Sequence, residues 1–221
     1  MSSHNLILAF DSGSPLISVA VQAHGEVLSG CEEQTRSSTQ IPRLASQLLA
    51  TADRSWNQLD AVVAARGPGS FTGLRVGLAF ALGLHQSLQI PGTAISTLRL
   101  LAQSVAIEEP VVAAVNAWKG SWFAQAFDAP TIKGQLRQPL TEPRKVRLPE
   151  LETLNMPVIV ANQHKELPDA LRGKRSLAEI ALSVATHPVL DWQPATLQNP
   201  LYLAAAPATK PSGPKPLINF N

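Results

Sequence analysis

The segment from Leu74 to Leu84 constrains the fold more than any other part of this sequence, because Arg75 is its only polar side chain. It follows a glycine-rich turn, and this order predicts a helix from about Thr72 to Leu88. An ordinary surface helix has one apolar stripe and one polar face, so a helix that is apolar all round needs cover on both sides. A sheet can cover one side, and a second helix of this chain or a partner chain can cover the other.

Small residues recur every four positions on this predicted helix, at Gly73, Gly77 and Ala81. A face of small residues lets another element approach closely. The pattern does not distinguish a covering helix from the same chain, near Leu44–Ala52, from a partner subunit. Both interpretations therefore stay open at the level of the residues.

The elements before and after this helix predict an α/β fold. Three apolar runs separated by short turns are typical of an antiparallel meander, and they precede alternating helices and strands. This order predicts a mixed sheet with helices packed on it. We expect strands in Asn5–Phe10, Leu16–Val21, from Val27, Ala61–Ala65 and Thr93–Ile95, and helices with Pro42 in a first turn and over Thr97–Ala106.

The second half of the chain predicts a smaller lobe. A hairpin is expected around Lys119-Gly120, between Val111–Val115 and Trp122–Phe127, and the pattern is lost between Ile132 and Pro149. A strand over Pro157–Ala161 and a helix over Leu177–Ala185 are expected after that. We divide the chain into a first lobe (1–106), a second lobe (107–206) and a proline-rich tail (207–221) that we expect to be disordered.

The glycine segment RGPGSFTGLRVG, residues 66–77, could bind an anion, since it follows a predicted strand and opens a helix. Gly67, Gly69 and Ser70 would supply backbone N–H groups. A Walker A loop is excluded because Leu74-Arg75 follows Gly73 where Lys-Ser or Lys-Thr is required. A dinucleotide fingerprint does not fit, because the glycine spacing is too long and no acidic residue follows before Ile107. The alternative is a tight turn whose glycines permit close backbone packing.

The turn Asp11-Ser12-Gly13-Ser14 joins the first two predicted strands. Such a turn can cradle phosphate, with the carboxylate orienting a metal-bound water. It can equally be a plain hairpin turn, because Asp, Ser and Gly all favour turns. The second half offers no second phosphate loop, and the five histidines show no metal-ligand spacing. We therefore expect no metal, no cofactor and no catalytic residue.

Charge and cysteine content bear on whether the protein binds nucleic acid and on the compartment in which it works. Only 15% of residues are charged, and the net charge of +2 is too small to argue for nucleic-acid binding by itself. The single cysteine, Cys31, allows no disulfide within the chain, which fits a reducing cytoplasm. No signal peptide or membrane span is evident. We expect a cytoplasmic protein with no membrane contact.

Several segments resemble the TsaB (YeaZ-type) family. The glycine segment is very similar to that family's signature, and LILAFDSGSPLISVAV, residues 6–21, looks like its opening strand pair. Ile90-Pro91, Ile95–Leu98 and Pro200–Leu203 resemble later family segments. The similarity is strong over about the first half of the chain and patchy afterwards. Asn116-Ala117-Trp118 and Ala204 depart from the family pattern.

The resemblance implies an actin-like (ASKHA, RNase H-like) fold of two lobes. It also implies an accessory subunit that does not catalyse the threonylcarbamoylation of the tRNA adenosine next to the anticodon, but binds a TsaD-like catalytic subunit. A TsaE-like ATPase would join that pair, self-association through overlapping helices is implied, and tRNA would be met only through the complex. The expected partner-binding residues are Leu44, Leu48, Phe71, Leu74, Gly77, Leu78 and Ala81. The alternative function is a stand-alone actin-fold ATPase or phosphotransferase that uses Asp11 and the Gly67–Gly73 loop.

Overall fold

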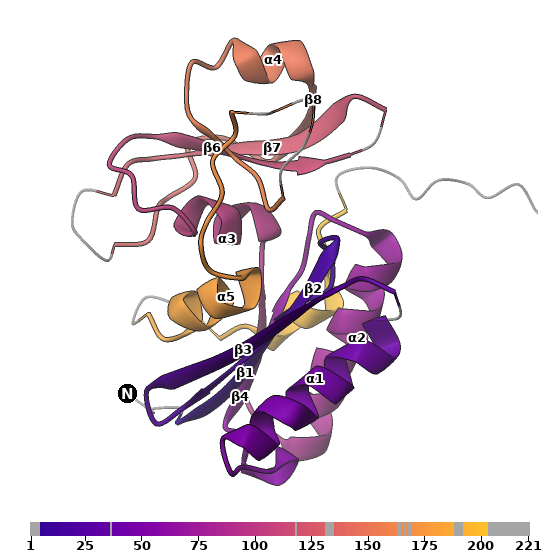
Figure 1. Ribbon diagram of the computed structural model, residues 1–221. Coiled ribbons are helices and arrows are strands. Elements are labelled where there is room, and N and C mark those ends of the chain that lie inside the picture. Colours follow the sequence, from indigo (N-terminus) through magenta and orange to yellow (C-terminus); the bar gives the residue numbers. More distant parts are fainter. Residues whose placement is uncertain are drawn as a thin grey trace, which may run out of the picture.

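The computed structural model describes residues 5–35, 37–117, 119–130, 135–162, 165, 167, 169–187 and 192–202. Two sheets lie one above the other, with α3 (Thr97–Gln103) and α5 (Leu177–Ala185) between them (Figure 1). Two longer helices, α1 (Ser37–Thr51) and α2 (Phe71–Leu88), cover the outer side of the lower sheet. This arrangement confirms the expected α/β class, with mixed sheets and flanking helices.

The larger sheet has the order β3-β2-β1-β4-β5. Its strands are β1 (Leu6–Asp11), β2 (Leu16–Ala23), β3 (Glu26–Glu33), β4 (Ala61–Ala65) and β5 (Gly92–Ile95). The first three pair antiparallel, and β4 joins β1 and β5 in parallel. This confirms the predicted meander. Every residue of β1 and β4 is buried, because helices cover both faces of the sheet at its centre.

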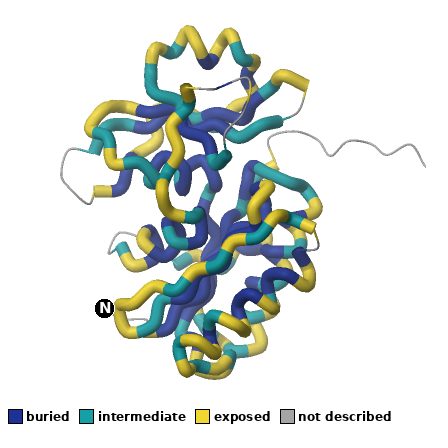
Figure 2. Tube along the Cα trace, viewed as in Figure 1, coloured by how far each residue is buried: buried dark blue, intermediate teal, exposed yellow. Residues whose placement is uncertain are grey.

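Alternate side chains of the central strands enter two different cores. Leu8 and Phe10 of β1 pack with α1 and α2 on one face of the sheet. Ile7 and Ala9 pack on the other face with α3 and α5. This is the period of two that a strand imposes on its side chains. Figure 2 shows the buried residues running along the strands, whereas β3 alternates between exposed and half-buried positions at the sheet edge.

Helix α1 begins earlier than the sequence predicts. It starts at Ser37, so Pro42 lies inside the helix, and the prediction of a first-turn proline is wrong. The start is held by Gln40, whose side chain accepts a hydrogen bond from the N–H of Thr35 (2.9 Å) and donates one to the carbonyl of Glu33 (2.8 Å). Tertiary anchoring of this kind overrides a local proline signal.

The smaller sheet has the order β8-β7-β6-β9. The hairpin of β6 (Val111–Asn116) and β7 (Ser121–Phe127) around Lys119-Gly120 is confirmed, and both turn residues have positive φ. Strand β9 is only Val158–Ile159. The segment without a sequence pattern contains β8 (Arg144–Arg147) and α4 (Leu148–Glu152), which the sequence did not predict.

Residues near the C-terminus pack on the larger sheet. On the division expected from the sequence, all of residues 107–206 belong to the second lobe, so the two assignments differ there. Helix α5 is confirmed over its predicted residues, and it packs on β1, β2 and β4. The short helix η2 (Pro194–Gln198) packs on β5 and α2, with Leu197 buried. The other short helix, η1, spans Trp56–Gln58. The expected disordered tail, 207–221, lies outside the described residues.

Candidate functional site

The β1–β2 turn and the loop after β4 meet, since β1 and β4 are parallel neighbours and both segments leave their carboxyl ends. The N–H of Ser70 donates to the carbonyl of Gly13 (2.7 Å), and the hydroxyl of Ser12 donates to the carbonyl of Gly73 (2.9 Å). The structure therefore brings together the two segments that contain the predicted phosphate-binding residues: Asp11, Ser12, Gly13, Gly67, Gly69 and Ser70.

Glycines occupy this region where a side chain would not fit. A methyl group on Gly69 would lie 2.5 Å from the carbonyl oxygen of Gly13. On Gly73 it would overlap the carbonyl oxygen of Ser12, and on Gly77 it would overlap the Ser12 hydroxyl. The first turns of α2 thus pack directly on the β1–β2 turn, as the close-packing alternative requires.

Three backbone N–H groups of this region, those of Gly13, Ser70 and Gly73, donate within the chain. Besides the Ser70 bond, the N–H of Gly13 donates to Oδ1 of Asp11 (3.0 Å), and the N–H of Gly73 donates to the Ser70 hydroxyl (3.2 Å). A phosphate loop instead directs its N–H groups outward at the ligand. The geometry favours the packing interpretation, and phosphate binding at these residues stays an untested prediction.

Asp11 is the most unusual titratable group of the larger sheet. Its side chain is 1% exposed, and its Oδ2 atom has no hydrogen-bond partner. Burial raises the pKa of this carboxyl above its ordinary value, and hydrogen bonds from Ser14 and Gly13 offset that only in part. The carboxyl also borders a cavity between the two sheets.

Most of the residues predicted to bind a partner are covered by the chain itself. Sheet and helix α1 lie against one side of α2 and bury five of the seven predicted positions. Of the predicted partner-binding residues, only Leu48 and Phe71 are partly exposed in the isolated chain, and partner binding at all seven positions stays a prediction. The five covered residues are Leu44, Leu74, Gly77, Leu78 and Ala81.

The opposite side of α2, which we call its outer face, is exposed or half-buried and carries apolar and polar residues. It comprises the exposed or half-buried residues Thr72, Arg75, Val76, Ala79, Leu82, Gly83 and Gln86. A methyl group on Gly83 would meet no atom within 4 Å. The small residues Gly73, Gly77 and Ala81 form the other stripe of the helix. Arg75, the lone charge in the apolar run, marks the side of the helix that faces solvent.

The outer face continues into a cluster with the C-terminal segment. The rings of Phe71 and Tyr202 stack with centroids 4.9 Å apart, and the guanidinium carbon of Arg75 lies 3.9 Å from the Phe71 ring centroid. Arg75 Nε also donates to the Tyr202 hydroxyl (3.2 Å). Beside this cluster, a groove of about 550 Å³ runs between α2 and residues 197–202. The arrangement offers an apolar helix face with one positioned cation.

Within the described part of the chain, no group of three His, Cys, Asp or Glu side chains is arranged to hold a metal ion. Among the helices of those residues, none has the length and apolar character to cross a membrane.

The sequence resembles known proteins of one biosynthetic pathway. The pattern of the family described as "TsaD: tRNA N6-adenosine threonylcarbamoyltransferase" matches residues 32–183. Proteins named "tRNA threonylcarbamoyladenosine biosynthesis protein TsaB" are 40% identical over 116 residues in Haemophilus influenzae and 36% identical over 121 residues in Escherichia coli. These matches cover 50% and 53% of this chain, and 49% and 52% of the relatives. The chain thus matches about half the length of these curated relatives.

The fold resembles solved structures over more of the chain. The structure described as "YeaZ from Pseudomonas aeruginosa" superposes with a TM-score of 0.67 at 24% identity, covering 82% of this chain and 90% of that one. A second Pseudomonas aeruginosa structure, described as similar to peptidase YEAZ, gives a TM-score of 0.66 at 25% identity with the same coverage. These similarities confirm the fold that the sequence resemblance implies.

Proposed function

Since this chain belongs to the family described as TsaD, and its curated relatives are TsaB proteins, we propose that it takes part in the biosynthesis of threonylcarbamoyladenosine in tRNA. Its role is that of an accessory subunit in the cytoplasm, without catalysis of the transfer. It binds a TsaD-like catalytic subunit, which modifies the adenosine next to the anticodon. The chain meets tRNA only through that complex.

The observation that supports a binding role is the outer face of α2, which is only partly bordered by η2 and residues 200–202 and leaves Ala79 and Gly83 exposed. An accessible, partly apolar helix face is typical of a protein–protein contact. Ala79 and Gly83 lie one turn apart near its centre, so a helix of the partner can approach the α2 backbone closely. Arg75, held against Phe71 and Tyr202, adds a fixed cation at one end.

The same face could serve self-association, so a homodimer and the TsaD-like complex would compete for it. A TsaE-like ATPase is expected to join the heterodimer rather than the isolated chain. These assemblies follow from the proposed role, and the oligomeric state of each mixture distinguishes them.

A stand-alone ATPase or phosphotransferase receives less support. The N–H groups of Gly13, Ser70 and Gly73 donate within the chain, and a buried carboxylate repels phosphate unless a cation lies between them. Stoichiometric ATP binding by the purified chain would favour this alternative over the accessory role.

Substitution on the outer face tests the interface. Ala79→Arg places a charge at the centre of the proposed contact, where it would be desolvated without a counter-charge. We expect the affinity for the host's TsaD-like protein to fall about 30-fold or more, which corresponds to about 2 kcal/mol. The measurement is co-purification followed by calorimetric titration, with folding checked by circular dichroism.

The matched control is Ser183→Arg, which adds the same charge to an exposed position of α5 on the other face of the sheet. It should leave the affinity unchanged. If Ala79→Arg and Gly83→Arg both fold and bind as tightly as the original chain, the outer face of α2 is not the interface.

A further inference from the structure

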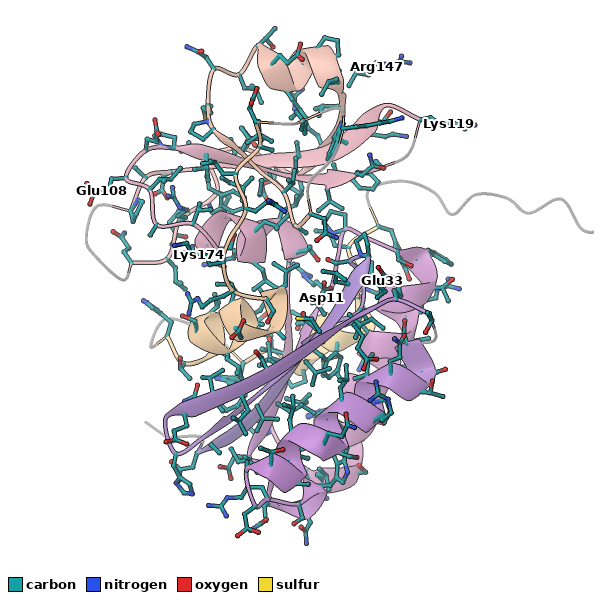
Figure 3. The ribbon with its side chains drawn as sticks, viewed as in Figure 1. Asp11, Glu33, Glu108, Lys119, Arg147 and Lys174 are labelled. Carbon is teal, nitrogen blue, oxygen red and sulfur yellow. The ribbon has the colours of Figure 1, made fainter. Side chains whose placement is uncertain are left out.

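A cavity of about 690 Å³ lies between the two sheets, away from the outer face of α2. Its walls come from the β1–β2 region, from α3, and from the segment that leads from β9 into α5. Asp11, at the end of β1 in the larger sheet, and Lys174, between the two sheets, both line it (Figure 3). The proposed subunit role makes no use of this space.

The floor of the cavity carries a buried acid, Asp11, and one of its two carboxylate oxygens lacks a donor. Asp11 is 1% exposed, and its Oδ1 atom accepts a hydrogen bond from the N–H of Gly13, whereas Oδ2 has no partner. A buried carboxylate oxygen without a donor is costly, so such groups are normally hydrogen-bonded or paired with a cation. The missing partner is a donor group, and a positively charged one would be favoured most.

The other charged side chains of the cavity lie at different places from Asp11. Arg172, Lys174 and Arg175 are exposed and line its mouth. Glu179 also lines it, but its Oε2 atom accepts the N–H of Ser176 (2.6 Å) in the capping box of α5. The cavity is therefore negative at its floor and positive at its rim.

An apolar wall connects the floor to the rim. It is formed by aliphatic side chains from several parts of the chain. The uncharged polar residues beside it are Ser14, Ser18, Ser104, Asn162 and Ser176. A ligand that matches these surfaces has a cationic donor at one end, an anionic group at the other and an aliphatic part between or beside them. The aliphatic residues include Leu16, Leu101, Val160, Leu171 and Leu177.

A phosphate at the floor does not fit this order of charges. It would lie against the Asp11 carboxylate, and the N–H of Ala178 near the start of α5 already donates to the Ser18 hydroxyl (3.2 Å). A bound nucleotide would therefore have to direct its phosphates to the rim.

We propose that this cavity binds a small zwitterion of the α-amino-acid class. The ammonium group donates to Oδ2 of Asp11, the carboxylate lies toward Arg172, Lys174 and Arg175, and an aliphatic side chain lies on the apolar wall. The site is separate from the subunit interface, and this inference does not depend on the proposed function.

The test is a binding screen of the full chain at pH 8, with each of the twenty L-amino acids as the probe. Chemical-shift changes in ¹⁵N spectra locate the site, and calorimetry gives the affinity of the best probe. We expect saturable one-to-one binding with shifts at the amides of Ser14, Ser18 and Gly173. The N-acetyl derivative of that probe lacks the ammonium group and should bind at least tenfold more weakly.

Variants then separate the two ends of the ligand. Asp11→Asn keeps the shape of the floor and should weaken the best amino acid at least tenfold, whereas Asp53→Asn, an exposed residue elsewhere, should not change its affinity. Arg172→Gln with Lys174→Gln should weaken the amino acid more than its decarboxylated amine. The proposal is overturned if no amino acid binds with a Kd below 10 mM, which corresponds to about −2.7 kcal/mol. It is also overturned if Asp11→Asn binds the best amino acid as tightly as the original chain does. Binding of magnesium-ATP at the floor, without binding of the amino acids, would overturn it as well.

Discussion

Gly73 and Gly83 lie on the same helix but have opposite surroundings. A methyl group at Gly73 would overlap the carbonyl oxygen of Ser12, whereas at Gly83 it would enter open space. We expect Gly73→Ala to lower the free energy of unfolding by about 1–3 kcal/mol, because the turn must shift to admit it. Gly83→Ala should raise it by about 0.5–1 kcal/mol, because alanine is the better helix former.

Urea unfolding of both variants measures these changes from the midpoint at unchanged slope. The two variants are controls for each other, since both replace a glycine of α2 with alanine. Equal changes in stability would show that α2 does not pack on the β1–β2 turn as closely as described. Gly77→Leu should resemble Gly73→Ala, because its side chain would meet the Ser12 hydroxyl.

Asp11 gives the stability of this chain a pH dependence of unusual sign. Burial raises the pKa of its carboxyl in the folded state above the unfolded value of about 3.9. Between these two pKa values the folded state binds more protons, so this group's contribution to stability falls as the pH rises. The penalty is complete above the folded pKa and absent below the unfolded one. For each pKa unit between the unfolded and the folded value, the free energy of unfolding at high pH is lower by about 1.4 kcal/mol.

Comparison with Asp11→Asn isolates this effect, since the asparagine does not titrate. We expect the unfolding free energy of the variant, relative to the original chain, to increase as the pH rises from about 4 toward the folded pKa of Asp11, and to stay constant above it. The measurement is chemical unfolding at a series of pH values in a constant buffer mixture. A difference that stays constant over this range would show that Asp11 has an unshifted pKa.

At the scale of elements, the sequence predicts those whose pattern is set by local burial. Strand β4 and helix α5 have the predicted bounds, because β4 is buried at every residue and α5 begins at the Ser176 cap. Helix α2 differs from its prediction by one residue at its start. These elements carry apolar runs whose lengths and flanking glycine, proline or cap residues distinguish strand from helix.

Elements that depend on distant contacts could not be predicted. Strand β8 reads Arg-Lys-Val-Arg and buries only Val146, so it has no alternation to detect. Arg137 reads as part of a basic surface, yet it is 1% exposed and donates to the carbonyls of Ile107, Glu109 and Asp128. Those carbonyls lie far from it in sequence, and no local pattern reveals that they converge.

The candidate sites show the same limit. The sequence identified α2 as unusual, but whether Gly77 or Gly83 faces outward depends on which stripe meets the sheet. It also selected the Asp11 turn, yet the cavity beside it is completed by residues 160–162 and 170–177 from the other end of the chain. Local sequence patterns indicate candidate residues, but contacts between distant parts of the chain determine how those residues are arranged.

At the scale of the whole molecule, the C-terminal segment ties the chain back to its first half. Thr196 Oγ1 accepts a hydrogen bond from the N–H of Ala94 (2.7 Å), and Leu197 is buried against the larger sheet. The N–H of Leu201 donates to the carbonyl of Arg66 (2.7 Å), at the base of the glycine loop. Residues 194–202 therefore close the exposed side of β5 and support the loop that starts α2.

Two truncations test this closure. A chain that ends at Ala206 should keep its Tm within about 1 °C, because the proline-rich composition of 207–221 predicts little apolar burial there. A chain that ends at Gln193 loses the burial of Leu197, about 1.5–3 kcal/mol, and the hydrogen bond at Ala94, about 1 kcal/mol. For a chain of this size, that loss lowers the Tm by about 5–15 °C.

Differential scanning calorimetry of both truncations, beside Leu197→Ala in the full chain, gives the measurement. The point variant leaves the backbone of 194–202 in place, so it should lower the Tm by part of the larger loss, since it removes the buried side chain alone. If the chain ending at Gln193 has the same Tm as the full chain, the packing of residues 194–202 contributes nothing to stability. If the chain ending at Ala206 melts several degrees lower, residues 207–221 contribute to the folded structure. Such a result would make Leu217, Ile218 and Phe220, the apolar side chains near the end of that segment, the next residues to substitute.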